Sequence, residues 1–230
     1  MARGIFVTGT DTCVGKTVIT GLLARYFLES GHQTITQKWI QTGSSCLDSD
    51  DIAQHLHLMG KNREEIRNYL PYMLSYSFKY PSSPHLAAAI EKKEIKPEKI
   101  KDDFKFLAKH FDIVIVEGTG GVLVPFSKKG LILDIVEELR LLVIIVAKNK
   151  LGAINHTLLT IEAVRKRGLD IIGVIFNNLE EDIAEIILED NPKIISNLTG
   201  EKILGILPYL EDNKQLYELV NQIGEKLLKL

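Results

Sequence analysis

Nine residues near the N-terminus have the composition of a loop that binds phosphate groups. The run GTDTCVGKT (residues 9–17) follows a short apolar run and opens a helical pattern, which is the context that such a loop requires. Backbone N–H groups at the start of a helix converge on an anion, and the helix dipole adds positive potential. Lys16 can reach the β- and γ-phosphates of a nucleotide, and the Thr17 hydroxyl can ligate Mg²⁺. The run predicts a nucleotide site; the alternative is an ordinary glycine-rich turn between a strand and a helix.

Carboxylates that could complete this site occur in two later segments. Glu117 ends the apolar run DIVIVE (residues 112–117) and is followed by the segment GTGG. A carboxylate at a strand end beside a phosphate loop is where Mg²⁺ usually finds its second protein ligand. A solvated glutamate before a loop is the alternative. Asp48, Asp50 and Asp51 form the second acidic segment, which could bind a cation, cap the helix expected at residues 52–58, or do both.

A second lysine, Lys38, ends another expected strand in the segment KWIQTG (residues 38–43). The carboxyl ends of parallel strands meet at one edge of a sheet, so we expect Lys38 to lie beside the phosphate loop. It would supply a further cation there, and solvation at the surface is the alternative.

The elements that must position these groups alternate along the chain. Short apolar runs predict strands at residues 4–8, 34–38, 112–117, 141–147, 171–176 and 202–207. Apolar residues at three- and four-residue spacing predict longer helices at residues 16–30, 152–167 and 213–230. This alternation predicts an α/β fold of three layers, with a mostly parallel central sheet flanked by helices.

All 230 residues are expected to form one ATP-binding domain, because neither an internal repeat nor a long linker is found in the sequence. The polar region from Ser44 to His110 has a helical pattern without a clear strand. We interpret it as a helical insertion after the second strand, and a separate helical subdomain is the alternative.

The composition argues against several classes of protein. The chain has 28 basic and 30 acidic residues, a net charge of −2, and so no basic excess for nucleic acid or an anionic membrane. Cys13 and Cys46 form neither a disulfide framework nor a metal pattern. The six histidines give no metal cluster, since His55 and His57 diverge on a helix. The most apolar window, residues 139–147, is far shorter than the ~20 residues of a membrane span. We therefore expect a cytoplasmic protein that binds neither membranes nor nucleic acid.

The chain resembles the dethiobiotin synthetase family, whose fold is that of the P-loop NTPases. The matching stretches are in family order and span nearly the whole chain: GTDTCVGKT (9–17), KWIQTG (38–43), SDDIA (49–53), PSSPH (81–85), EGTGG (117–121), LGAINH (151–156) and LGILPYL (204–210). Five residues between the glycines of the loop, instead of the usual four, are this family's own variant.

The resemblance implies an ATP-dependent ligase of biotin biosynthesis that forms C–N bonds. An amine of 7,8-diaminononanoate takes up CO₂, which bicarbonate can supply, to give a carbamate. The carbamate oxygen attacks the γ-phosphate of ATP, and the second amine then closes the ring and expels phosphate. The products are dethiobiotin, ADP and phosphate, Mg²⁺ is required, and the expected assembly is a homodimer.

The resemblance also implies a role for individual residues. Lys16 and Lys38 would be catalytic, and Mg²⁺ would be held by Thr17, Asp50 and Glu117, with Asp51 as the alternative to Asp50. The diamine would contact Thr42. Its carboxylate would be bound across the dimer interface by Gly152, Ala153, Ile154 and Asn155. The residues expected to bind ATP are Thr12, Cys13, Val14, Gly15, Lys16, Thr17, Val18, Asp50, Glu117, Gly118, Thr119, Gly120, Asn177, Asn178, Leu207, Pro208 and Tyr209.

Two positions depart from the family pattern. Trp39 stands where the family usually has proline and could reshape the pocket wall, and Cys13 stands where glutamate is frequent. The competing function is that of a partition-type ATPase, a switch that couples ATP to a protein partner or a membrane. That class carries a lysine five positions before the loop lysine, where this chain has Asp11.

Overall fold

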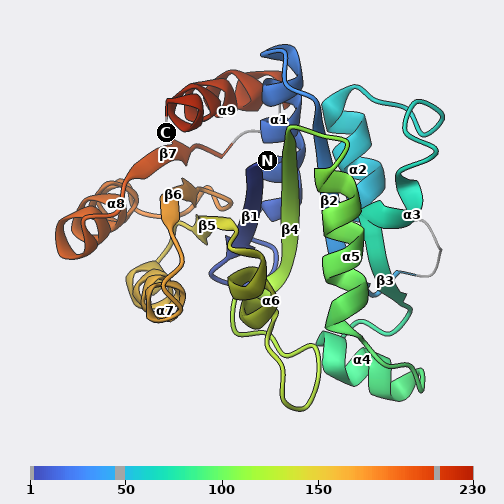
Figure 1. Cartoon of the computed structure of the whole chain (residues 1–230). Coiled ribbons are helices and arrows are strands. Elements are labelled where there is room, and N and C mark those ends of the chain that lie inside the picture. Colours follow the sequence, from blue (N-terminus) through green and yellow to red (C-terminus); the bar gives the residue numbers. More distant parts are fainter. Residues whose placement is uncertain (1–2, 45–49, 210–212, 230) are drawn as a thin grey trace.

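Seven parallel strands form one central sheet in the computed structural model, which describes residues 3–44, 50–209 and 213–229 (Figure 1). The strands are β1 (Arg3–Gly9), β2 (Thr34–Thr42), β3 (Leu74–Phe78), β4 (Ile113–Gly121), β5 (Leu142–Lys148), β6 (Ile171–Asn177) and β7 (Ile203–Leu207). They lie in the order β3-β2-β4-β1-β5-β6-β7, and all neighbouring strands are parallel. The predicted α/β fold is therefore confirmed.

Alternate residues of the inner strands face two separate cores. In β1, Ile5 and Val7 belong to one buried cluster and Phe6 to the other, because successive side chains of a strand point to opposite faces. Figure 1 shows α1 (Lys16–Glu29) and α9 (Asn213–Leu228) covering the first face. The second face is covered by α5 (Pro97–Ala108), α6 (Ile132–Leu139), α7 (Ala153–Lys166) and α8 (Glu185–Thr199).

The remaining described helices are α2 (Asp50–Met59), α3 (Leu70–Met73) and α4 (Pro84–Ile90). α2 packs closely on α1 at Gly21, where an added Cβ would lie 2.8 Å from the Leu58 side chain. Only glycine allows this approach, which brings α2 over the end of β2. The packing matters for function because α2 carries side chains into the site described below.

The region from Ser44 to His110 was expected to be a helical insertion without a clear strand, and the structure corrects the second part of this expectation. It contains β3, which pairs in parallel with β2 through Lys38 opposite Leu74 and Ile40 opposite Tyr76. The sequence of β3 is LSYSF, and its two serines interrupt the apolar run. An edge strand is covered less completely than a central one, so it lacks the continuous apolar run that marked the other strands.

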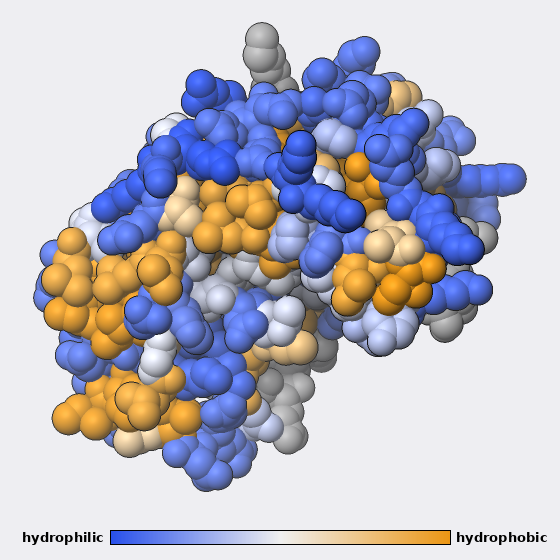
Figure 2. Space-filling model, turned by 90° about the horizontal axis from the view of Figure 1, so that it is seen from below, coloured by the Kyte–Doolittle hydropathy of each residue, from blue (hydrophilic) through white to orange (hydrophobic). Residues whose placement is uncertain are grey.

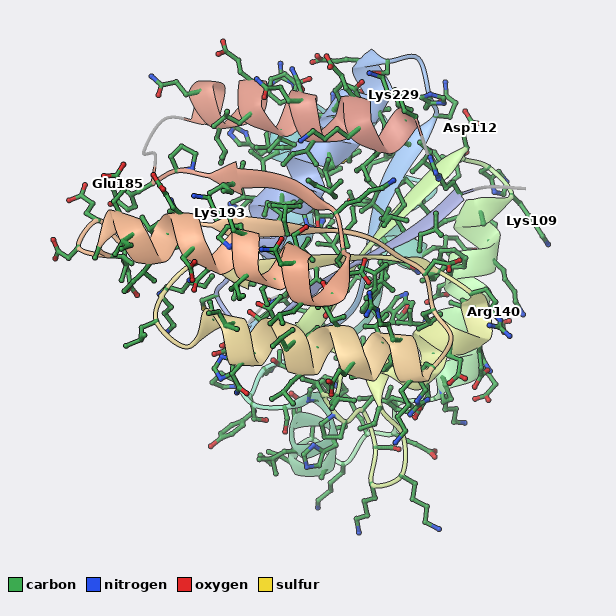
Figure 3. All side chains as sticks on the ribbon, turned by 90° about the vertical axis from the view of Figure 1, so that its left-hand side faces the viewer. Lys109, Asp112, Arg140, Glu185, Lys193 and Lys229 are labelled. Carbon is green, nitrogen blue, oxygen red and sulfur yellow. The ribbon has the colours of Figure 1, made fainter. Side chains whose placement is uncertain are left out.

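Two strands extend four residues beyond their predicted ends. β2 continues from Lys38 to Thr42, and β4 continues from Glu117 to Gly121. These extensions lie at the carboxyl edge of the sheet, where the loop after β1 also begins. Figure 3 shows Asp112 and Arg140, which precede β4 and β5, at the opposite end of the sheet from Glu185 at the start of α8. None of the described helices combines the length and the apolar character that a membrane span requires.

Candidate active site

The phosphate loop occupies residues 10–15, between β1 and α1. Gly15 caps the helix with a φ of +96°, and a Cβ there would lie 2.3 Å from Nδ2 of Asn177. Both the backbone conformation and the close approach therefore require glycine. Val14 is fully buried beneath the loop, and its carbonyl accepts a hydrogen bond of 3.0 Å from Asn177 Nδ2. This contact fixes the loop to the end of β6.

Lys16, the first residue of α1, folds back over the loop. Its Nζ donates a hydrogen bond of 3.0 Å to the carbonyl of Asp11, and its side chain is almost fully buried. Burial, followed by repulsion from the charge of Lys38, lowers the pKa of Lys16 to about 8. The ammonium group is held close to the loop N–H groups in the position where a triphosphate would sit.

Lys38 and Glu117 form a buried ion pair on neighbouring strands. They are register partners in β2 and β4, and Lys38 Nζ lies 2.8 Å from Glu117 Oε1. Lys38 Nζ also lies 2.7 Å from Asp51 Oδ2 on α2 and 3.3 Å from the Gly118 carbonyl. Burial alone would lower the pKa of Lys38, but the two carboxylates outweigh it and raise that pKa above its usual value. Burial would raise the pKa of Glu117, yet the charge of Lys38 and contact with His55 hold it at about 2.

Thr17 brings a hydroxyl to the same carboxylates. Its Oγ1 donates to Glu117 Oε1 at 3.0 Å and lies 3.4 Å from Asp51 Oδ1. Asp51 was the alternative to Asp50 as a metal ligand, and its carboxylate lies in the site. The side chain of Asp50 falls outside the described part of the structure, so the prediction for Asp50 stays untested.

A cavity of about 470 Å³ opens beside these side chains. Among the residues predicted from sequence, those that line it are Thr12, Cys13, Gly15, Lys16, Thr17, Val18, Lys38, Thr42, Glu117, Thr119 and Gly120. The structure thus brings together the loop after β1 and the ends of β2 and β4. The Gly118 carbonyl accepts a hydrogen bond from Lys38 Nζ.

Five of the residues predicted to bind ATP lie at or after the ends of β6 and β7: Asn177, Asn178, Leu207, Pro208 and Tyr209. Asn177 is buried against the loop, and the N–H of Asn178 donates to the Leu207 carbonyl at 2.8 Å. Pro208 and Tyr209 follow β7 and are exposed. Of these positions, Asn177 contacts the loop, and none of them lines the main cavity.

The predicted carboxylate site lies at the start of α7. Gly152 caps this helix with a φ of +88°, and Ala153, Ile154 and Asn155 form its first turn. A second cavity of about 130 Å³ separates the helix start from loop residues 10–14, and its walls include Lys148, Lys150, Ala153 and His156. The start of α7 therefore lies behind the loop and not in the main cavity.

Trp39 does not reshape the pocket wall. It is buried in the core, with its ring stacked on Phe6 at a centroid distance of 5.3 Å. Its Nε1 donates a hydrogen bond of 3.0 Å to Gln37 Oε1. Because side chains alternate along β2, Lys38 faces the site and Trp39 faces the opposite side of the sheet.

His55 is the buried neighbour of the site that the sequence did not indicate. Its ring is fully buried on α2, and Nε2 lies 2.9 Å from Glu117 Oε2. A signal was present: Ile52, His55, Leu56 and Met59 have the spacing of the apolar face of a helix, which predicts burial for the histidine. His57, two residues on, is exposed, as the predicted divergence requires.

Comparison with known proteins gives this geometry its context. A family model described as an AAA domain matches residues 3–215. The ATP-dependent dethiobiotin synthetase of Clostridium perfringens is 37% identical, with 99% of both chains covered. The enzyme of that name from Thermodesulfovibrio yellowstonii is 35% identical over all of this chain and 96% of its own. This chain belongs to the dethiobiotin synthetase family.

Solved structures confirm the fold of this family member. The septum site-determining protein MinD of Pyrococcus horikoshii, in complex with Mg-ADP, has a TM-score of 0.63 at 17% identity and covers 99% of this chain and 96% of its own. The ParA protein of pNOB8, bound to nonspecific DNA, has a TM-score of 0.61 at 11% identity and covers 100% of this chain and 98% of its own. At such identities the likeness concerns the arrangement of strands and helices.

Proposed function

We propose that the chain catalyses the ATP-dependent carboxylation and ring closure of 7,8-diaminononanoate to dethiobiotin, with release of ADP and phosphate. The observation that carries this proposal is a second buried lysine, Lys38, facing the same cavity as Lys16 in a chain that matches dethiobiotin synthetases over its whole length. A nucleotide site needs one cation for its phosphates. A further cation suits a reaction in which a second anion must approach the γ-phosphate.

The reaction has three steps. One amine adds to CO₂ and loses a proton, which gives a carbamate. A carbamate oxygen attacks the γ-phosphorus and displaces ADP, and the second amine then attacks the carbamate carbon and displaces phosphate. Two anions must be held together before the second step, so positioning and charge stabilisation are the main tasks of the protein.

The two lysines divide these tasks. Lys16 lies over the phosphate loop and would contact the β- and γ-phosphates. Lys38 lies at the end of β2, where it would bridge the carbamate and the γ-phosphate. Thr42 is four residues further along β2 and lines the same cavity, in a place suited to contact the diamine near its carbamate.

The oxygens of Thr17, Asp51 and Glu117 are the groups that would hold Mg²⁺. One hydroxyl and two carboxylates match the hard oxygen ligands that this cation prefers, with waters and phosphate oxygens completing its shell. Glu117 Oε1 is the oxygen contacted by Lys38 Nζ and the Thr17 hydroxyl, both from residues that line the cavity, so it is the oxygen placed to meet a cation there. Within the same residues, no three His, Cys, Asp or Glu side chains form a metal cluster, so a dedicated protein cage is not what we propose. When bound, Mg²⁺ would neutralise charge on the transferred phosphoryl group.

We further propose that adenine lies against Asn177, Asn178 and the segment Leu207–Tyr209. The two asparagines offer amide groups at the end of β6, and Asn178 Oδ1 is buried without a hydrogen-bond partner in the described part of the chain. The ring of Tyr209 is exposed and can pack on a base.

ATP as co-substrate also supports a cytoplasmic reaction.

A homodimer would complete the substrate site, with Gly152 to Asn155 binding the substrate carboxylate of the partner subunit. N–H groups at the start of α7 suit a carboxylate. The start of this helix does not line the main cavity of its own chain, so this role would need the helix of a second copy. Leu151 is 81% exposed directly before α7, and Leu159 on the same helix is also exposed. Figure 2 shows apolar patches on the face seen from below, which a second subunit could cover.

The alternative is a partition-type ATPase, which the fold alone would permit. Asp11 argues against it, because its side chain accepts a hydrogen bond of 2.7 Å from the Thr12 N–H within the loop. A carboxylate there lacks the positive charge that the signature lysine of that class supplies.

The decisive experiment supplies the purified protein with ATP, Mg²⁺, ¹³C-bicarbonate and 7,8-diaminononanoate. We expect dethiobiotin labelled at its ureido carbon, detected by mass spectrometry, and phosphate release that requires the diamine. Phosphate release at the same rate without the diamine, and without labelled product, would contradict the proposal and favour the partition-type switch.

A further inference from the structure

His55 occupies a place where a histidine is costly. Its ring is fully buried, and neither ring nitrogen has a hydrogen-bond partner with standard geometry among the described residues. A polar ring buried in this way lowers stability unless a nearby group compensates. The compensating group is Glu117, whose Oε2 lies 2.9 Å from Nε2.

The two oxygens of Glu117 have different neighbours. Oε1 receives Lys38 Nζ at 2.8 Å and the Thr17 hydroxyl at 3.0 Å, both from groups that line the cavity. Oε2 faces inward to His55, which comes from a helix packed tightly on α1. One oxygen is thus turned to the site, and the other is turned to the protein interior.

We propose that His55 is a positioning residue that holds Oε2 of Glu117 through Nε2–H, so that the carboxylate keeps its orientation toward Mg²⁺ and nucleotide. The inference rests on the proposed function, in which Glu117 is a metal ligand. When nucleotide, carbamate and cation enter, Lys38 and Thr17 turn to these groups and release Oε1. His55 is then the protein contact that stays, and the 2.9 Å approach aligns into a hydrogen bond.

This role differs from that of an ordinary packing residue. A histidine that only fills space can be replaced by any side chain of similar size at the cost of stability alone. A positioning histidine needs a donor at the place of Nε2, and neighbours of metal ligands typically change metal affinity or activity by about 10- to 100-fold when they are lost.

Two substitutions separate these roles. In His55→Gln, the side-chain amide nitrogen extends about as far as Nε2 and can still donate to Glu117. In His55→Asn, the amide reaches only to the place of Nδ1, where it has no carboxylate to meet. Both variants bury an amide in the same cavity, so their stabilities are expected to fall together. The matched control is His57→Gln, which changes an exposed histidine on the same helix.

A spectroscopic measurement tests the ground state directly. We expect ¹⁵N NMR of the histidine-labelled wild type to show a proton on Nε2 of His55, assigned by its loss in His55→Gln. An unprotonated Nε2 would overturn the proposal, because it could not donate to Glu117.

The main test measures Mn²⁺ affinity by electron paramagnetic resonance in the presence of a non-hydrolysable ATP analogue, with the melting temperature recorded for each variant. We expect His55→Asn to weaken Mn²⁺ binding by about 10- to 100-fold, with His55→Gln and His57→Gln close to the wild type. Equal weakening in His55→Asn and His55→Gln, or no weakening in either, would overturn the positioning role. Because this readout needs no diamine, a wild type that binds Mn²⁺ and analogue but makes no dethiobiotin would refute only the proposed function.

Discussion

Two buried lysines face one cavity, and their pKa values are shifted in opposite directions. Lys16, in the phosphate loop, donates to a backbone carbonyl, and burial together with the charge of Lys38 lowers its pKa to about 8. Lys38, in β2, contacts the carboxylates of Glu117 and Asp51, which raise its pKa in spite of burial. We call the charge of Lys16 unbalanced, because burial and the charge of Lys38 both oppose it. The charge of Lys38 is balanced, because two carboxylates pair with it.

The difference suggests how the site is prepared for its ligands. An unbalanced buried ammonium costs stability in the empty protein and gains most when an anion arrives, as a triphosphate would. A balanced one supports the fold without ligand and must share its charge when a carbamate approaches. The following predictions test whether this contrast between the two regions holds.

The largest effect is expected for Lys38→Gln. Removing the charge between the carbamate and the γ-phosphate should lower turnover with diamine and bicarbonate by about 10²–10³-fold, with only a modest loss of ATP affinity. Lys38→Arg should rescue only part of the activity, because a planar fork replaces a point charge. ATP affinity by calorimetry and turnover by phosphate release on the same variants check the prediction. Near-normal turnover of Lys38→Gln would contradict both the role of Lys38 and the ligase function.

Lys38→Gln should also lower the free energy of unfolding by about 3 kcal/mol, since two carboxylates lose the cation between them. Urea unfolding at pH 7 measures this. Unchanged stability would mean that the balanced state of Lys38 is not what supports the β2–β4 region.

Lys16→Met is expected to move stability in the opposite direction. The folded pKa of about 8 lies below the ordinary 10.5, so the charged lysine destabilises the fold below pH 8 and ceases to do so above pH 10.5. The variant should be more stable than the wild type at pH 7 by up to about 3 kcal/mol, and this advantage should shrink between pH 8 and 10.5. Urea unfolding of both proteins at pH 7 and pH 10 gives the double difference. If Lys16→Met were less stable than the wild type at pH 7, the two lysines would not affect the stability of the fold in opposite ways. Whatever its stability, Lys16→Met should release phosphate much more slowly than the wild type, because it lacks the cation that would contact the β- and γ-phosphates.

A smaller effect separates the two aspartates. Asp51→Asn should weaken Mg²⁺ activation more than Asp50→Asn, because the Asp51 carboxylate lies 2.7 Å from Lys38 Nζ and 3.4 Å from Thr17 Oγ1. This reverses the order that the family resemblance implied. Mg²⁺ titrations of turnover in both variants decide between them, and a larger effect at Asp50 would restore the original assignment.

The smallest expected effect concerns Cys13, which is exposed and lines the main cavity. Alkylation with iodoacetamide should weaken nucleotide binding only a few-fold, because the added group stands at the cavity wall, and ATP should protect the thiol. Mass spectrometry reads labelling at Cys13 separately from Cys46, with and without ATP. Equal labelling of Cys13 in both conditions would show that the nucleotide does not cover this side of the loop.

Much of the site could be predicted because its residues are close in sequence or end conspicuous strands. The loop at residues 9–17 is one continuous motif, and the apolar run before Glu117 marks a buried strand. β3 was not predicted because its serines interrupt the apolar pattern. The extension of β2 was not predicted because Gln41 and Thr42 are polar. The contact between His55 and Glu117 could not be predicted, because a local sequence pattern does not indicate which carboxylate a buried histidine will contact.

Local periodicity and contiguous motifs are enough to establish the parallel α/β fold, the phosphate loop and the family. Packing between distant segments sets three further features: Lys38 pairs with Glu117 and Asp51, Trp39 faces away from the site, and His55 lies behind Glu117. These facts depend on the register between β2 and β4 and on the rotation of α2 against α1. A shift of one residue in either would turn different side chains toward the cavity, and the free energy that fixes them comes from packing between segments far apart in the chain.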